Sequence, residues 1–285
     1  MKTRVQNPVR VAAIDFLNPA PLMWDFEHAP HSAELAERYT LNYTKPSECA
    51  ASLLAGTADL GLIPIAALTP ELAIVPGSTI ASLDRVRSIQ LIVRGSRSLE
   101  EVRTVAADTA SRSSLAYAHI LFRKFLGSSP EFVPAQADPV AMLQAADAAL
   151  LIGDPALLAL EERDSIEQRL GPCQWIDLAH EWKTRTGLPW VAAVWAVRPD
   201  SIADPAQLIA DLDHSRIAGL AHIDDLVAEW TPRIALPPAT IHTYLTENIH
   251  YTLDPECLEA LLLFRRYAAE IDVLAPLPEP RFLGR

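Results

Sequence analysis

Ile14-Asp15-Phe16-Leu17-Asn18-Pro19-Ala20-Pro21 joins a short apolar strand to a helix that begins at a proline. Five such junctions occur along the chain, and three of them, at residues 14–21, 107–114 and 150–155, carry residues suited to holding a small anion. Where a strand leads into a helix, backbone N–H donors and the positive end of the helix dipole lie at the carboxyl edge of the sheet. Open α/β sheets bind ligands at that edge. The pattern therefore predicts an α/β protein that closes on a small polar molecule.

Length and charge narrow the class of protein. The chain has 285 residues, which fits two domains of ordinary size, and 50% of them are hydrophobic. Lys and Arg total 24 against 36 Asp and Glu, giving a net charge of −12 with no basic cluster. Because nucleic-acid binding needs clustered Lys and Arg, we expect no nucleic-acid partner. A small anionic ligand stays compatible with this charge, because it responds to local donors.

The cysteines and the N-terminal segment indicate a cellular compartment. Cys49, Cys173 and Cys257 are widely spaced and form no Cys-x-x-Cys pair, which fits reduced thiols. Residues 1–10 are polar and lack the apolar core of a secretory signal. No apolar window reaches the length of a membrane span. We therefore expect a cytoplasmic protein with no membrane partner, and the sequence does not specify an oligomeric state.

The order of the expected elements indicates two lobes. Strands and helices alternate, and two long apolar strands, at residues 88–93 and 189–197, bracket the middle of the chain. We expect one discontinuous lobe from residues 1–93 and 196–285, and a second from residues 94–195. The bracketing strands would cross between the lobes as a hinge, and the ligand would lie in the cleft.

Helix starts supply the candidate ligand-binding groups. Residues 109–114, Thr-Ala-Ser-Arg-Ser-Ser, offer hydroxyl and N–H groups that suit a carboxylate or a phosphate. Asn18 follows a strand, and Asp154 precedes Pro155 at the start of another helix. Each of these residues also serves as an ordinary helix cap. Their functional interpretation depends on the fold bringing them to one cleft.

Asp15 is the unexpected residue at this edge of the sheet. A carboxylate there repels an anionic ligand unless it is paired or protonated. Asp15 suits a general acid or base, and it equally suits a structural ion pair with Arg87 or Arg112. The sequence leaves both roles open.

Several other chemistries find no support in the sequence. It contains no Gly-x-Gly-x-x-Gly motif, no P-loop and no Gly-x-Ser-x-Gly elbow. The eight histidines form no His-x-x-x-His pair and no Cys/His cluster. We therefore predict a site without a metal ion and without a cofactor.

A series of motifs, in order along nearly the whole chain, resembles the chorismate dehydratase family of the futalosine route to menaquinone. The first is Val11-Ala12-Ala13-Ile14-Asp15-Phe16-Leu17-Asn18-Pro19-Ala20-Pro21-Leu22, similar to the family's opening Tyr-Leu-Asn-Ser-x-Pro-Leu. The others lie at residues 46–50, 59–64, 86–88, 108–114, 151–157, 186–189 and 244–253. The Ser-Pro-Cys-Pro-Asn segment typical of the related naphthoate synthase is absent.

The resemblance implies a fold, a reaction and a set of site residues. The fold is the two-lobed type II periplasmic-binding-protein fold, and the activity is a cofactor-free lyase. Chorismate loses water to give 3-[(1-carboxyvinyl)oxy]benzoate, with the product's aromaticity as the driving force. By motif, Asn18 and Ser88 lie at the reacting ring and are the predicted catalytic residues. The predicted substrate-binding residues are Asp15, Ser82, Thr109, Ser111, Ser113, Gly153 and Asp154, of which Gly153 and Asp154 close the cleft from the second lobe.

The chain departs from the family's pattern at Asp15-Phe16, where Ser-Tyr is usual, and at Pro19, where a small polar residue is usual. The base that removes the ring proton is therefore left open between Asp15 and a carboxylate of the substrate. Two alternatives to the dehydratase also stay open. One is a protein that binds an aromatic or carboxylic ligand without converting it, and the other is the related naphthoate synthase.

Overall fold

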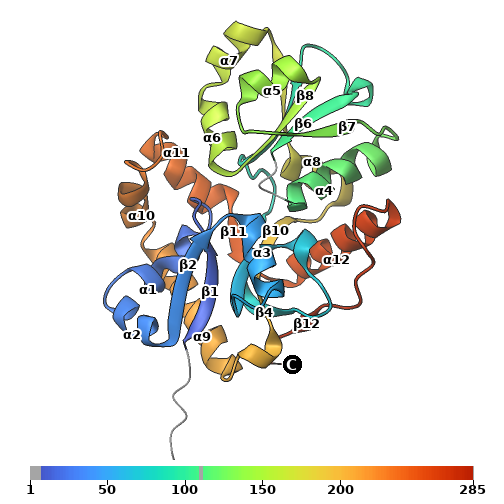
Figure 1. Cartoon of the computed structure of the whole chain (residues 1–285). Coiled ribbons are helices and arrows are strands. Elements are labelled where there is room, and N and C mark those ends of the chain that lie inside the picture. Colours follow the sequence, from blue (N-terminus) through green and yellow to red (C-terminus); the bar gives the residue numbers. More distant parts are fainter. Residues whose placement is uncertain (1–7, 109–111, 285) are drawn as a thin grey trace, which may run out of the picture.

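The computed structural model describes residues 8–108 and 112–284, and the strands there form two sheets (Figure 1). The first sheet has the order β11-β4-β10-β3-β1-β2, with β12 beside β4. Its strands are β1 Val9–Ile14, β2 Tyr39–Thr44, β3 Leu60–Pro64, β4 Ala73–Ser82, β10 Trp190–Val197, β11 His250–Thr252 and β12 Arg281–Phe282. The second sheet has the order β7-β6-β8-β5-β9. Its strands are β5 Ile89–Arg94, β6 Thr104–Asp108, β7 Glu131–Ala135, β8 Ala148–Ile152 and β9 Cys173–Asp177.

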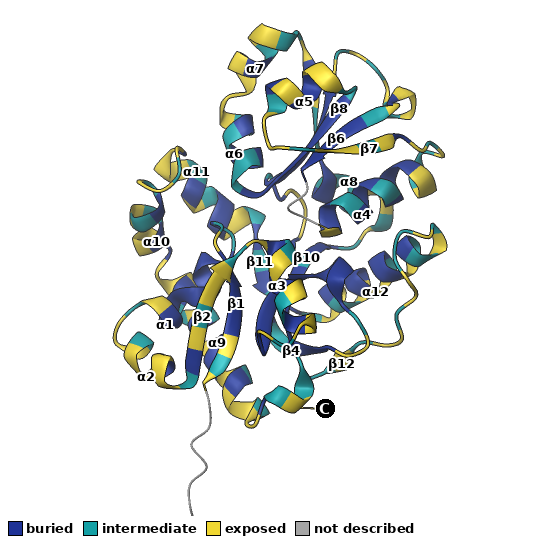
Figure 2. Cartoon of the chain, in the orientation of Figure 1, coloured by how far each residue is buried: buried dark blue, intermediate teal, exposed yellow. Residues whose placement is uncertain are grey.

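Helices cover both sheets. Around the first sheet lie η1 Ala20–Met23, α1 Trp24–Glu27, α2 His31–Arg38, α3 Pro46–Leu54, η2 Ile65–Ala67, η5 Pro199–Ser201, α9 Pro205–Ala221, α10 Ile223–Trp230, α11 Pro238–Thr243, η6 Tyr244–Asn248 and α12 Pro255–Glu270. Around the second lie η3 Leu99–Glu101, α4 Arg112–Ile120, η4 Leu121–Phe125, α5 Pro139–Ala145, α6 Gly153–Glu161, α7 Arg163–Leu170 and α8 Leu178–Thr186. Helix α9 packs on β4, α3 on β3, and α12 on β10. The inner strands of both sheets are largely buried between these layers, whereas the edge strands β2 and β7 are mostly exposed or half-buried (Figure 2).

Aspartate and proline define where several helices begin. Helices α5, α9 and α12 each start with a proline that follows Asp138, Asp204 or Asp254. Each of these carboxylates accepts an N–H of the first turn, and Asp177 does the same for α8. The side chain satisfies donors that lack a partner within the helix, and proline lacks the donor altogether. These local signals set the helix starts that the sequence predicts.

The strand pairings show in which sheet each of the two bracketing strands lies. Strand β1 is parallel to β2 and β3, and β8 is parallel to β6. Strand β10 is antiparallel to β3 and β4, and β5 is antiparallel to β8 and β9. Each strand that was expected to cross between lobes therefore lies inside one sheet. The chain passes between the sheets at residues 83–88 and 187–189, so we propose lobe boundaries there.

An aromatic cluster joins the second lobe to the first. Tyr117 of α4 donates its hydroxyl hydrogen to the carbonyl of Val191 in β10 at 3.1 Å. Its ring centroid lies 4.3 Å from that of Phe264 in α12. The indole N–H of Trp182 in α8 donates to the carbonyl of Pro189 at 2.9 Å. Burying these rings while satisfying their polar atoms holds α4 and α8 against the first lobe.

Two arginines and one aspartate hold the opposite edge of the first sheet. Asp59, just before β3, accepts hydrogen bonds from the side chains of Arg10 and Arg198, each at 2.7 Å at the closest. Burial disfavours the charged carboxylate, but these hydrogen bonds prevail and lower the pKa of Asp59 to about 2. The beginnings of β1 and β3 and the end of β10 are thereby tied together. Their other ends carry the candidate site.

Candidate functional site

A cavity opens between the two lobes and encloses about 530 Å³ of space, including the open solvent at its mouth. Within it, about 60 Å³ is space that the centre of a water-sized molecule can occupy. We call it the interlobe cavity, and it is lined by Ile14, Phe16, Asn18, Pro19, Pro46, Pro64, Ile80, Val86, Ser88, Ile89, Ser114, Ile152, Gly153, Trp190, Ala192 and Ala193. The lining side chains that the structure describes include no Asp, Glu, Lys, Arg or His. The walls are mostly apolar, with a few polar groups between them.

Asn18 presents a polar atom to the interlobe cavity. The residue lies in the turn between β1 and η1, and Pro19 directly follows it. Its amide oxygen is buried and has no hydrogen-bond partner among the residues that the structure describes. Buried polar atoms in folded proteins are nearly always hydrogen-bonded, and leaving one unpaired is costly. Asn18 is therefore suited to contact a ligand.

Ser88 lines the same cavity just before β5. It is only 2% exposed. Its carbonyl accepts the N–H of Gly153 at 2.7 Å, which links the start of β5 to the start of α6. Its side chain hydrogen-bonds with the phenol of Tyr244, and burial raises the pKa of that phenol far above its ordinary value. Tyr244 is therefore neutral and holds the Ser88 hydroxyl from behind.

Gly153 allows the two lobes to approach each other closely. Its φ is +63°, a backbone conformation that residues other than glycine rarely adopt. A Cβ at this position would lie 3.0 Å from the ring of Phe16 in the turn after β1. The ring therefore rests on bare backbone, and Phe16 and Gly153 together form one wall of the interlobe cavity.

Asp154 connects the second lobe to the same turn. Its carboxyl oxygen accepts the backbone N–H of Leu17 at 3.3 Å, across 137 residues of sequence. Burial raises the pKa of Asp154 to about 6, with a smaller contribution from the charge of Asp15, although the Leu17 N–H acts in the opposite direction. Leu17 adjoins Asn18, so Asp154 holds the turn that presents the Asn18 side chain.

Asp15 and Ser113 occupy other places than the sequence predicts. Asp15 is exposed and lines a neighbouring cavity with Glu27 and Tyr43 instead of the interlobe cavity. The hydroxyl of Ser113 donates to the carbonyl of Ala192 and accepts the N–H of Ala66, at 3.1 and 3.2 Å. It therefore holds α4 in place. Its hydroxyl hydrogen is committed to the protein, which argues against the predicted carboxylate contact.

The remaining residues that the sequence predicts near the site lie away from the cavity wall or outside the described residues. Ser82 is buried opposite Trp190 in the β4–β10 register, with no partner for its hydroxyl in the described chain, and it is not part of the cavity wall. Thr109 and Ser111 lie outside the described residues. Arg87, a suggested partner of Asp15, instead pairs with Glu161 at 3.7 Å.

Two lining residues were missed by the sequence analysis. Trp190 presents a buried indole N–H that has no acceptor within the described residues. It lies in a long apolar strand, where a tryptophan is indistinguishable from core. Ser114 is the third residue of α4 and lines the interlobe cavity, next in sequence to the predicted Ser113. Its position in the 109–114 segment is the sequence signal that could have identified it.

Solved structures define the class of this protein. A protein of Archaeoglobus fulgidus matches with a TM-score of 0.71 at 13% identity, covering 94% of this chain and 98% of that one. A Candida albicans protein described as having the generic periplasmic binding protein fold matches at 0.66 and 12%, covering 98% of each chain. The aliphatic sulphonate binding protein of Escherichia coli matches at 0.63 and 14%, covering 98% and 94%. The chain has a two-lobed α/β fold like that of periplasmic binding proteins, as the sequence predicts.

Sequence comparison identifies the family. Residues 9–270 match the menaquinone biosynthesis family, and the chain belongs to it. It is similar to the chorismate dehydratase of Thermus thermophilus, with 28% identity over 254 residues that cover 85% of this chain and 89% of that protein. These matches confirm the resemblance seen in the sequence. Within residues 8–108 and 112–284, no helix combines the length and apolar character needed to cross a membrane.

The contact between Phe16 and Gly153 predicts a specific loss of stability. Gly153→Ala adds both backbone strain and a clash with the Phe16 ring. Gly127→Ala is the matched control, because Gly127 has a similar φ of +66° and open space around it. In urea unfolding, Gly153→Ala should cost about 1–3 kcal/mol more than Gly127→Ala, the usual cost of overpacking. Phe16→Ala in the Gly153→Ala background should remove most of that difference, and equal losses for the two single variants would contradict the contact.

Proposed function

We propose that this protein is a chorismate dehydratase, a hydro-lyase of menaquinone biosynthesis that acts in the cytoplasm. The reaction converts chorismate to 3-[(1-carboxyvinyl)oxy]benzoate and water. Family membership and the Thermus thermophilus relative support this activity. The observation in the structure that carries it is the buried amide oxygen of Asn18, which lies at an apolar cavity between two lobes and has no partner among the described residues. An apolar lining with a few polar groups is typical of a site for a small molecule.

The reaction asks little covalent chemistry of the protein. A proton leaves the ring carbon that carries the ether, the neighbouring hydroxyl departs, and the ring becomes aromatic. The protein therefore has to orient the ring and stabilise the developing charge. In our proposal Asn18 and Ser88 contact the reacting ring. Gly153 and Asp154 close the cavity over it from the second lobe.

The proton acceptor in this proposal is a carboxylate of the substrate. Asp15 lies outside the interlobe cavity, and the lining side chains that the structure describes include no carboxylate or imidazole. Thr109 and Ser111, beyond the described residues, offer hydroxyls and no titratable base near neutral pH. The substrate brings its own carboxylates into the cavity. Of the two bases that the sequence left open, the cavity lining favours this one.

Incubation with chorismate tests the proposal. The purified protein should convert chorismate to an aromatic product, which absorbance detects. The mass of the product should be about 18 Da lower than that of chorismate, which corresponds to the loss of one water. Chorismate that binds and is recovered unchanged would indicate a binding protein. Failure to bind chorismate would favour the related naphthoate synthase.

Removing the Asn18 amide should affect turnover more than affinity. An amide donor or acceptor that stabilises developing charge contributes about a hundredfold or more to turnover in comparable sites. Asn18→Ala should therefore lower kcat by about that factor with a much smaller change in KM. Asn42→Ala, at an exposed position of β2, is the matched control and should match the wild type. A variant with normal kcat and a raised KM would make Asn18 a binding residue.

The raised pKa of Asp154 predicts a pH dependence of substrate binding. In an open form this carboxyl would ionise near its ordinary pKa of about 3.9, whereas in the closed structure its pKa is about 6. Closure is thus most favourable below pH 4, weakens as the pH rises through 6, and is constant above that. KM for chorismate should rise several-fold between pH 5 and pH 7. Asp154→Asn keeps an acceptor for the Leu17 N–H and should flatten this rise, and an unchanged slope would contradict the role of Asp154.

A further inference from the structure

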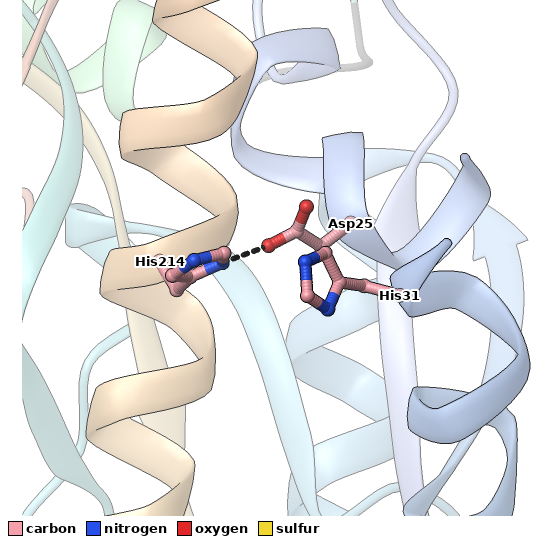
Figure 3. Close-up of side chains that lie close together, drawn as sticks. All are labelled: Asp25, His31 and His214. Atoms are coloured by element: carbon pink, nitrogen blue, oxygen red, sulfur yellow. Dashed lines mark hydrogen bonds and ion pairs between the residues drawn. The ribbon is translucent and has the colours of Figure 1, made fainter. Parts of the chain in front are cut away.

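Two histidines and an aspartate meet in the first lobe, away from the interlobe cavity. Asp25 comes from α1, His31 is the first residue of α2, and His214 comes from the middle of α9 (Figure 3). One potential ligand atom from each of the three residues lies within 4.8 Å of the other two. None of the three lines the interlobe cavity. The fold therefore brings together residues that the sequence separates by up to 189 positions.

Asp25 is held firmly as the inner member of this group. It is only 3% exposed. Its backbone N–H donates to the Ser215 hydroxyl at 3.0 Å, and that hydroxyl donates in turn to the carbonyl of Leu22 at 2.9 Å. Its carboxylate is bonded to Nδ1 of His214. A buried carboxylate is stable only when it is paired with a positive charge or coordinates a metal ion.

The second imidazole distinguishes this group from ordinary surface pairs. His31 packs edge-on against His214, with ring centroids 5.0 Å apart and an angle of 71° between the planes. Elsewhere, His222 pairs with Asp225 at 2.8 Å on the surface and stacks on the ring of Trp24. Two imidazoles and one buried carboxylate therefore direct ligand atoms to one place, where a single cation could contact all three.

A second group of possible metal ligands is less suited to bind an ion. His250, Asp254 and Cys257 also lie close together. Asp254 is occupied, because it caps α12 by accepting the Cys257 N–H at 2.8 Å and also bonds to His250. Burial raises the pKa of the Cys257 thiol to about 12, which opposes the thiolate that a metal ion requires. Local helix capping accounts for this arrangement.

We propose that Asp25, His31 and His214 bind one divalent transition-metal ion of the zinc type. Imidazole nitrogen and carboxylate oxygen are ordinary zinc ligands, with bonds of about 2.0–2.2 Å. A tetrahedron with such bonds sets its ligand atoms about 3.3–3.5 Å apart. The ligand atoms of the three side chains lie within 4.8 Å of one another. Rotation of the two exposed imidazoles can bring them to the tetrahedral spacing while Asp25 stays in place. Water would complete the coordination.

The position of the site indicates a structural effect. The ion would tie α1 and the first turn of α2 to α9, three elements joined otherwise by packing and a few hydrogen bonds. Helix α1 follows η1, which begins two residues after Asn18. Binding would therefore stabilise the part of the first lobe that carries the cavity turn, without placing the ion at the reacting ring.

Calorimetric titration with Zn²⁺ tests the site in the full chain, freed of any polyhistidine tag and treated with a chelator. The wild type should bind one tight equivalent and melt at a higher temperature when Zn²⁺ is present. His31→Ala and His214→Ala should each weaken binding by about tenfold or more, as loss of a ligand does. His222→Ala is the matched control, an exposed histidine paired with one aspartate, and it should bind as the wild type does.

The expected pattern can fail in clear ways. Equal affinity in the wild type, His31→Ala and His214→Ala would overturn the site. Loss of binding in His222→Ala as well would show that Zn²⁺ binds surface histidines without selectivity, and this too would overturn it. His31 and His214 are exposed, so their variants should fold, and unchanged circular dichroism without Zn²⁺ checks this. Asp25→Asn, which keeps the size of the side chain, should weaken binding in the same direction.

Discussion

The structure depends on the close approach of one turn of the first lobe to one helix start of the second. The Phe16 ring lies on the bare backbone of Gly153, and the Leu17 N–H is bonded to Asp154. Both contacts need a residue with a positive φ and no side chain at position 153. They bring Asn18 into a cavity walled by both lobes. The enclosed site exists only while this approach is maintained.

The rest of the fold supports that approach from a distance. The arginines around Asp59 secure the far edge of the first sheet, so the carboxyl ends of β1 and β3 are held in register. The Tyr117 cluster packs α4 on β10 and α12 and thereby limits how the lobes turn against each other. A solute-binding fold opens and closes around such connections. Here the turn and the helix start meet with little space between them, which favours a cavity that excludes water.

The sequence predicts the parts of the site that depend on local signals. Asn18, Ser88 and Gly153 follow or precede buried strands, and all three line the interlobe cavity as expected from their places in the motifs. The sequence does not predict which of two neighbouring cavities Asp15 lines. Ile14 and Phe16 line both the interlobe cavity and the neighbouring one, whereas Asp15 between them lines the neighbouring one.

Long-range partners account for the other differences. Ser113 was expected to hold a carboxylate, but its hydroxyl is engaged by residues 47 and 79 positions away, which no local pattern specifies. Trp190 shows the reverse case, because an apolar strand conceals a cavity-lining residue whose buried indole N–H has no acceptor in the described chain. The grouping of Asp25, His31 and His214 has the same origin. Spacing along the chain identifies clusters on one helix, whereas this group forms only when α1, α2 and α9 pack together.

The uncharged lining of the described part of the interlobe cavity bears on how a dianion could be held there. A chain with a net charge of −12 repels an anion at long range, and the lining residues that are described provide no positive side chain to offset this. The compensation has to come from backbone N–H groups and the helix dipoles at the starts of α4 and α6, which meet the cavity at Ser114 and Gly153. Such fixed dipoles need no rearrangement as charge moves within the ligand. A site of this kind leaves a substrate carboxylate more basic than a salt bridge to arginine would, and this is the property required of a carboxylate that removes the ring proton itself.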